Sequence, residues 1–410
     1  MKTLGIEDGP KLRSSQTLSS YEFSQAVLHE LKRRNKVLLP NLHSMTIDSH
    51  NLPYASLCLN QEVQWVTFKM ERFTSENMAQ VATRCIPQVG SGLRALHLQH
   101  SDNMTPALAE ETGLASGLQN LLNRTRLEEF HSQYYPLTDE MVEKILAMPS
   151  IHSVTLRREV ADLANLLPRV LHGEHQFRSF LINTFQFSAS DVAKIIRSLR
   201  PSRLFQFAIY FEHGVCGSDQ LCDIISTIDQ SCSPDHFSQL NISPICTIRH
   251  PQDMSATPLE YKIIKPLLNF KKLKKLSLPS TTFHLSDAEI KTLAMAWPEL
   301  TTLFLSDYPS GFAPKASPTA LIHLATYCKQ LIYLTFSFGE GGSDCSIPDD
   351  LDLAKNHGLK LLNVGCSRVN DEKEFATFLK TLFPELLFLF YRSEGEDYRR
   401  WINVHEELFP

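Results

Sequence analysis

The chain has 410 residues of ordinary globular composition, 43% hydrophobic and 21% charged, and a formal net charge of -5 at pH 7. So small a charge on so long a chain gives no general attraction to nucleic-acid phosphates, and no apolar run reaches the ~18 residues of a membrane span. Nine cysteines without a Cys-x-x-Cys pair argue against a zinc ribbon and against a disulfide framework.

The N-terminal segment contains a tail and one predicted helix. Residues 1–20 are rich in serine and lack apolar periodicity, which predicts a disordered tail. They also lack the apolar stretch of a secretory signal, so we expect an intracellular protein, cytoplasmic or nuclear. Residues 21–38 are predicted to form an N-terminal capping helix, whose apolar face carries Phe23, Ala26, Val27 and Leu31.

From residue 39 to residue 391 one short apolar pattern recurs thirteen times. It consists of an apolar residue, two residues of any kind, a second apolar residue, one further residue and a third apolar residue, as in Leu93–Leu98. The mean spacing of about 29 residues falls in the range of leucine-rich repeats. The first apolar residues of the copies are Leu42, Val63, Leu93, Leu127, Ile151, Phe177, Leu204, Phe237, Leu273, Leu300, Leu331, Leu359 and Leu386.

Helix signals fill the segments between the copies. Ser286 and Glu289 form a capping box at the start of one predicted helix. The apolar stripe that follows has helical spacing, at Ile290, Leu293, Ala294 and Trp297. Similar helices are predicted after Ser188, Ser317 and Asp371.

These alternating strands and helices predict an α/β leucine-rich-repeat solenoid, one elongated body with the outline of an irregular horseshoe or arc. A strand and a helix of this size cannot bury their apolar faces alone, so successive units must stack. Parallel strands are expected on the concave face and helices on the convex face. Residues 392–410 are predicted to close the array as a C-terminal cap that buries Trp401, Val404 and Leu408.

The repeats are irregular. Spacings between copies range from 21 to 36 residues, and the segment from Cys216 to Arg249 is the least regular. The asparagine that commonly follows the third apolar position is replaced by other residues, among them Gly339 and Ser367. The backbone groups of these turns must therefore find other hydrogen-bond partners.

The sequence offers only weak candidates for a catalytic, cofactor-binding or metal-binding site. The sequence from residue 213 to residue 250 holds several possible ligands, but their spacing matches no compact metal motif: His213, Cys216, Cys222, Cys232, His236, Cys246 and His250. The glycine-rich stretch Gly339–Asp344 lacks the lysine and hydroxyl residue of a phosphate loop. We therefore predict no catalytic residue, no cofactor and no metal site. The basic run from Lys262 to Lys275 could attract an acidic partner, although a solvated turn explains it better.

Protein binding has a predicted place on the concave face. The residues on either side of the middle apolar position of each copy point away from the core. The candidates for contact with a partner are Trp65, His97, His131, Thr155, Gln206, Lys275, Phe304, Tyr333, Asn363 and Phe388. Glu129 and Phe390 have the same outward position. Aromatic residues here are typical interface anchors, but closing the end of the array explains Phe388 and Phe390 equally well.

Several stretches resemble the F-box and leucine-rich-repeat proteins of mushroom-forming fungi. The resemblance covers most of the chain after residue 20 and rests on Leu39–Leu42, Ala320–Leu331, Leu362–Cys366, Phe378–Leu386 and Trp401. It implies substrate recognition or scaffolding in a cullin-type ubiquitin ligase, with a Skp-type adaptor as partner if an F-box precedes the array. The residues before Leu39 do not resemble an F-box. The alternatives are a stand-alone repeat adaptor or inhibitor and, less favoured, a hydrolase or transferase built on repeats.

Overall fold

The computed structural model repeats one strand and one helical segment along the chain. It describes residues 41–49, 52–70, 73–99, 112–132, 137–171, 177–199, 203–213, 218–244, 260–278, 283–305, 314–339, 358–392 and 395–410. The predicted tail at residues 1–20 and the predicted capping helix at residues 21–38 lie outside these described residues.

The chain divides into two compact units, Met1–Asn183 (unit 1) and Thr184–Pro410 (unit 2). The boundary falls inside the strand β6 (Ser179–Gln186), whereas we predicted one elongated body without a boundary. The apolar pattern runs through this point without interruption, so no linker composition marks it.

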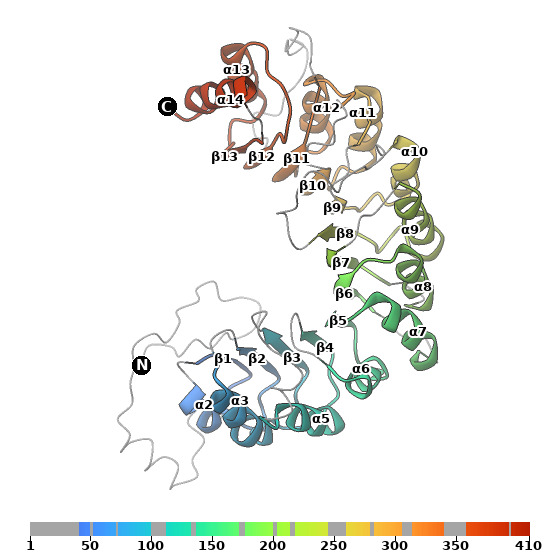
Figure 1. The fold of residues 1–410 in the computed structure, drawn as a ribbon, viewed down its shortest axis with the longest axis vertical. Helices are drawn as coiled ribbons and strands as arrows, with labels where there is room; N and C mark the ends of the chain where they lie inside the picture. Colours follow the sequence, from blue (N-terminus) through green and yellow to red (C-terminus); the bar gives the residue numbers. More distant parts are fainter. Residues whose placement is uncertain are drawn as a thin grey trace. The chain divides into compact units, whose positions relative to one another are not determined.

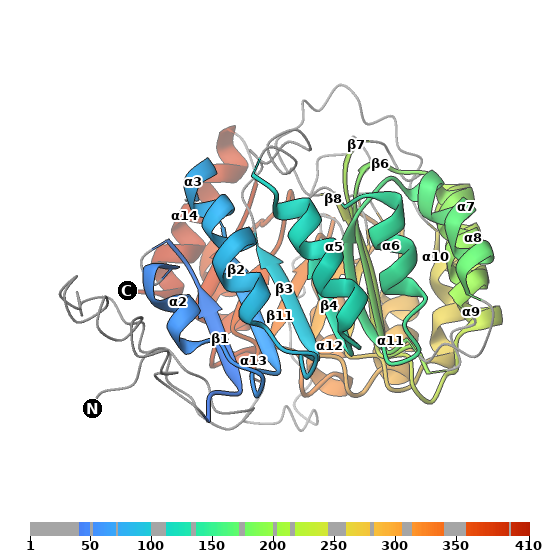
Figure 2. The same ribbon diagram turned by 90° about the horizontal axis from the view of Figure 1, so that it is seen from below.

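Unit 1 contains β1 to β5 and the first part of β6, with parallel neighbours that follow one another in chain order. The described helical segments lie along one side of these strands (Figures 1 and 2). The strands are β1 (Ser44–Ile47), β2 (Trp65–Lys69), β3 (Ala95–Gln99), β4 (Glu129–Ser132) and β5 (Ser153–Arg157). The helical segments are α2 (Leu52–Cys58), α3 (Ser75–Gln80), η2 (Val81–Cys85), η3 (Ile86–Gln88), α5 (Leu114–Arg124), α6 (Asp139–Leu146) and α7 (Val160–Val170).

Unit 2 continues the same alternation, again with parallel neighbours in chain order from β7 to β13. The helices α8 to α12 lie along one side of its strands (Figure 1). The strands are β7 (Gln206–His213), β8 (Gln239–Pro244), β9 (Lys275–Leu278), β10 (Thr302–Leu305), β11 (Tyr333–Phe336), β12 (Leu361–Asn363) and β13 (Phe388–Phe390). The helical segments are α8 (Ala189–Leu199), α9 (Ser218–Ser231), α10 (Tyr261–Ile264), η5 (Lys265–Asn269), α11 (Asp287–Ala296), α12 (Thr319–Tyr327), α13 (Glu372–Leu382) and α14 (Gly395–Leu408).

The predicted α/β solenoid of parallel strands and helices is confirmed. Each of the thirteen strands begins two residues after the first apolar residue of its copy, as β3 does after Leu93. The second and third apolar residues of that copy, Leu96 and Leu98, are buried against the helical layer. Burying one leucine side chain stabilises a fold by about 1.5–3 kcal/mol. The repeated apolar pattern therefore supplies the core of each unit.

The turns before most of the described strands join neighbouring repeats through the backbone. The carbonyl oxygen of Gln64 accepts hydrogen bonds from the N–H groups of Arg94 (2.8 Å) and Ala95 (2.9 Å). The same arrangement of one carbonyl and two donors precedes β10, β11 and β13. Because these bonds pair backbone with backbone, the start of each strand keeps its register without an asparagine side chain.

The helix α11 shows how one predicted unit forms. The carboxylate of Glu289 accepts hydrogen bonds from the backbone N–H and from the hydroxyl of Ser286, both at 2.8 Å. The helix ends one residue before Trp297, which we predicted as its last apolar position. The indole of Trp297 is fully buried, and its N–H donates to the carbonyl oxygen of Leu267 at 3.1 Å.

The segment that we expected to be least regular contains one of the longest helices. The helix α9 has 14 residues, and its buried residues include Leu221, Ile224, Ile225 and Ile228. These four residues have helical spacing, so the sequence carried a signal that our expectation did not use. Residues 214–217 and 245–259, on either side of this helix and the strand β8, lie outside the described part of the chain.

The C-terminal helix α14 packs its apolar face onto the last repeat, as predicted. Trp401 and Val404 are fully buried, whereas Leu408 is only half-buried. Among the helices that the structure describes, none combines the length and apolar character needed to cross a membrane.

Candidate functional site

The side of the strands that faces away from the helices, the open sheet face, carries its side chains in rows across neighbouring strands. The strand register aligns one row of unit 1 as Ser44, Trp65, Ala95, Glu129, Ser153 and Ser179. The next row contains Thr46, Thr67, His97, His131, Thr155 and Leu181. Side chains in adjacent positions of such rows are close enough to interact.

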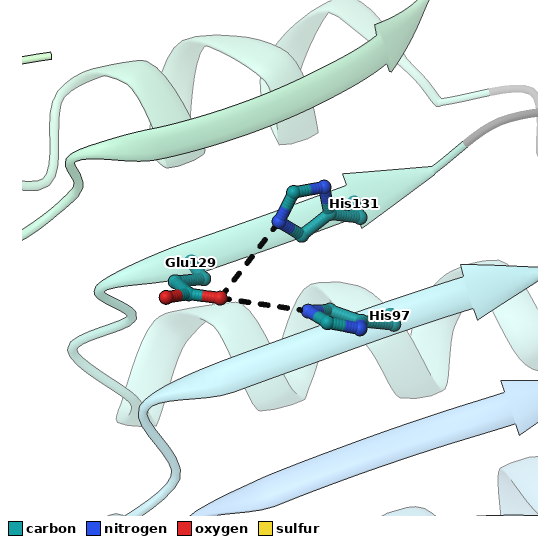
Figure 3. Close-up of side chains that lie close together, drawn as sticks. All are labelled: His97, Glu129 and His131. Atoms are coloured by element: carbon teal, nitrogen blue, oxygen red, sulfur yellow. Dashed lines mark ion pairs between the residues drawn. The ribbon is translucent and has the colours of Figure 1, made fainter. Parts of the chain in front are cut away.

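Three side chains converge where these rows cross β3 and β4. His97 extends from β3, and Glu129 and His131 extend from β4, all on the same side of the sheet (Figure 3). One carboxylate oxygen of Glu129 lies 3.8 Å from Nε2 of His97 and 3.9 Å from Nε2 of His131. The two imidazole rings meet edge to face, with their centroids 4.4 Å apart. We name these three residues the His–Glu–His cluster.

The core side of the same strands holds this cluster in place. Leu96 and Phe130 occupy paired positions on β3 and β4, and both are almost fully buried. Because side chains alternate across a strand, burial of these two residues directs His97, Glu129 and His131 to the opposite face. The apolar pattern in the sequence therefore determines the direction of the polar side chains.

Hydroxyl groups on β5 contact the ring of His131. The Nδ1 atom of His131 lies 2.7 Å from the hydroxyl oxygen of Thr155, and its Nε2 atom lies 3.3 Å from the hydroxyl oxygen of Ser153. These contacts fix the orientation of the imidazole. Thr155, one of the predicted contact residues, is itself buried, with its hydroxyl group against the ring of His131.

The Glu129 carboxyl group is anionic near neutral pH. Its interactions with His131 and then with His97 hold its pKa well below the usual range, although partial burial opposes them. Two imidazoles and one carboxylate are also groups that ligate metal ions, and their ligand atoms lie within 4.8 Å of one another. Ligand groups of this kind therefore come together at a place where we predicted no metal site from the sequence.

The open sheet face of unit 2 has a different character, because aromatic side chains occupy it. One row of its register contains Gln206, Gln239, Lys275, Thr302, Tyr333, Leu361 and Phe388. The next row contains Ala208, Asn241, Ser277, Phe304, Thr335, Asn363 and Phe390. Tyr333, Phe388 and Phe390 are 44%, 56% and 50% exposed. The rings of Phe388 and Phe390 stack with their centroids 6.4 Å apart.

The ten predicted contact residues separate into two groups. His97, His131 and Thr155 lie close together in unit 1, and Trp65 is exposed on β2, where its register partner is Ala95 on β3. Six lie in the two rows of unit 2, namely Gln206, Lys275, Phe304, Tyr333, Asn363 and Phe388. Whether they contact a partner stays a prediction.

The cysteine and histidine residues between residues 213 and 250 are described only in part. Cys216, Cys246 and His250 lie outside the described residues. Cys232 is buried, and desolvation raises the pKa of its thiol to about 12, which disfavours the thiolate that a metal ion requires. The glycine-rich stretch is likewise described only at Gly339, whose N–H donates to the carbonyl oxygen of Ala316 at 2.9 Å.

The basic run is partly paired with acidic residues. Lys262 lies 2.8 Å from Glu260, and Lys274 lies 3.5 Å from Glu299. All four side chains are well exposed, so these contacts contribute little to stability and fit a solvated turn.

Comparison with known proteins gives the chain no family. No family model matches it, and no curated protein matches it significantly. We therefore infer the function from the geometry of the two open sheet faces.

Proposed function

We propose that this protein is a protein-binding solenoid whose open sheet face in unit 2 contacts the partner. The observation that carries the proposal is the exposure of Tyr333, Phe388 and Phe390 on strands rather than in a core. Exposed aromatic groups on a regular surface are unfavourable in water, and they are common anchors of protein interfaces.

The surroundings of these aromatic residues fit an interface. Lys275 and Gln206 occupy the same register row at a distance along the sheet, which gives the aromatic region a polar border. Interfaces commonly combine an apolar centre with a polar rim. The stacked rings of Phe388 and Phe390 are already ordered, so less side-chain entropy is lost on binding.

The exposure of Tyr333 favours binding over the alternative that these aromatic residues only close the array. Phe388 and Phe390 lie on β13, the last strand, but Tyr333 lies two strands earlier in the sheet. Closing the end of the sheet cannot explain an exposed tyrosine at that position.

The resemblance to F-box and leucine-rich-repeat proteins extends this proposal to substrate recognition in a cullin-type ubiquitin ligase. A location in the cytoplasm or nucleus is part of the same proposal. It is supported by Cys58, Cys85, Cys222 and Cys232, which form no disulfide among the described residues, because reducing compartments maintain cysteines in that form. The alternative is a stand-alone adaptor or inhibitor with the same binding face.

Affinity capture from cell lysate tests the proposal with the tagged full chain as bait. The test variant combines Tyr333→Ala and Phe388→Ala. The matched control is Met295→Ala, which removes an exposed apolar side chain (57% exposed) from the helix α11. Loss of one anchor weakens binding by about 2 kcal/mol, so we expect the double variant to capture its specific proteins at least ~10-fold less.

Equal capture by the wild type and the double variant would contradict the proposal, as would an equal loss with Met295→Ala. Unfolding midpoints of both variants should match the wild type, because all three side chains are exposed. A Skp-type adaptor and a cullin in the captured set would support the ubiquitin-ligase role. Specific partners without them would favour the stand-alone adaptor.

A further inference from the structure

The His–Glu–His cluster in unit 1 has no role in the proposed contact of unit 2. Its three side chains come from two adjacent strands, and each is about one-third exposed. The Nε2 atoms of both histidines are the ring nitrogens nearest to the carboxylate oxygen of Glu129. The cluster therefore directs two nitrogen atoms and one anionic oxygen toward a common point (Figure 3).

The Nε2 atom of His97 lacks a hydrogen-bond partner although it is buried. It makes no hydrogen bond to any described residue, and its 3.8 Å contact with the carboxylate of Glu129 is an ion pair too long to be a hydrogen bond. Buried polar atoms in folded proteins are nearly always paired. An ion between His97 and Glu129 would satisfy this nitrogen.

Thr155 orients His131 as residues around metal sites commonly do. When Nδ1–H of His131 donates to the hydroxyl oxygen of Thr155 at 2.7 Å, the lone pair is on Nε2. A ring nitrogen held in this way is a better metal ligand, because its tautomer and direction are already set.

The three ligand atoms are near enough to bind one metal ion if their side chains move closer together. In a tetrahedral zinc site with bonds of about 2.0–2.1 Å, the ligand atoms lie about 3.4 Å apart. The two nitrogen–oxygen separations of 3.8 and 3.9 Å thus need to shorten by about half an ångström, and the separation of the two ring nitrogens, which is within 4.8 Å, by up to about 1.4 Å. Rotation of the partly exposed side chains allows these shifts.

We propose that His97, Glu129 and His131 bind one divalent transition-metal ion of the zinc type. Imidazole nitrogens favour such ions over Mg²⁺ and Ca²⁺, which prefer ligand sets made of oxygen atoms. Three protein ligands leave a fourth position for water or another external ligand. Because the cluster lies on the open sheet face, this fourth position is directed toward solvent.

Titration calorimetry and cobalt spectroscopy test the site on the full chain after treatment with a chelator. We expect one Zn²⁺ or one Co²⁺ per chain, with the visible absorption of tetrahedral Co²⁺, and no binding of Mg²⁺. The ligand variants are His97→Ala, Glu129→Gln and His131→Ala. Loss of an orienting partner costs about 10–100-fold in metal affinity, so Thr155→Val should fall in that range and each ligand variant should lose more.

His152→Ala provides the matched control. His152 lies 3.9 Å from Glu128 and is 29% exposed, as His131 is, but the pair belongs to no three-ligand group among the described residues. This variant should bind Co²⁺ as the wild type does.

Several outcomes would overturn the proposal. They are no binding by the wild type, unchanged binding in all three ligand variants, or an equal loss in the control. Thiolate absorption of the Co²⁺ complex would also overturn it, because the ion would then be bound by cysteine. Circular dichroism of each variant separates loss of a ligand from loss of the fold, and Glu129→Gln preserves the shape of the side chain.

Discussion

Ser367 shows how single residues replace the asparagine that is absent from these turns. Its hydroxyl group donates to the carbonyl oxygen of Val364 at 2.5 Å and accepts a hydrogen bond from the N–H of Phe338 at 2.8 Å. Its own carbonyl oxygen accepts from the indole N–H of Trp401 at 2.8 Å. One fully buried serine thus connects the turn after β12 to the previous repeat and to the C-terminal cap.

We predict that Ser367→Ala lowers the free energy of unfolding of unit 2 by about 1–3 kcal/mol, because the buried N–H of Phe338 loses this acceptor. Urea unfolding followed by circular dichroism measures the change. Ser198→Ala is the matched control, since its hydroxyl only donates back to Lys194 within the helix α8, and we expect a change within about 0.5 kcal/mol. Similar midpoints for the two variants would refute this role of Ser367.

The sequence predicted that the side chains of the candidate site point away from the core, but it did not predict that they meet at one place. The apolar pattern predicts that His97, Glu129 and His131 all point outward. Glu129 was nevertheless left out of our candidates, because its interaction with His97 depends on the register of β3 and β4. Aligning the two copies of the apolar pattern that begin at Leu93 and Leu127 would have placed Ala95 beside Glu129 and His97 beside His131. The side-chain angles that bring the carboxylate to both rings cannot be obtained from any pattern.

At the scale of elements, strand positions were predictable and helix details were less so. A strand here needs only alternating inward residues, and the pattern specifies them directly. Helices in the weaker repeats depend on packing against neighbours. The helix α3, for example, continues without a break into the π-helical segment η2 (Val81–Cys85) and the 3-10 segment η3, which no sequence signal indicated.

The C-terminal helix α14 closes unit 2 through one large side chain. The ring of Trp401 lies 5.6 Å from that of Phe375 and 5.9 Å from that of Tyr391, and its N–H is bonded to Ser367. These contacts explain why a helix with mostly charged and polar residues stays on the array.

We predict that Trp401→Ala destabilises unit 2 by about 3–5 kcal/mol, because it leaves a cavity among aromatic rings and removes a buried hydrogen bond. Asn403→Ala, an exposed position on the same helix, should change stability by less than about 0.5 kcal/mol. Thermal and urea unfolding of both variants provide the comparison. A loss for Asn403→Ala as large as that for Trp401→Ala would show that the helix, not the indole, carries the effect.

At the scale of the whole molecule, the sequence predicted the repeat architecture but neither the division into two units nor the partner. The residues that point into the core must be apolar for the chain to fold, and the regular apolar pattern identifies them. The outward residues of each open sheet face are not constrained by the fold, so the sequence predicts where contact is possible and leaves its identity open. Unit 1 presents an ionic cluster and unit 2 an aromatic surface on the same kind of scaffold.

Photo-crosslinking in cells tests whether the open sheet face of unit 2 binds a protein partner. A benzophenone amino acid replaces Tyr333 on β11 in one variant and Met295 on α11 in the other, two positions of similar exposure on opposite sides of unit 2. We predict a discrete crosslinked protein from position 333 and none from position 295. Crosslinks from position 295 alone would contradict it.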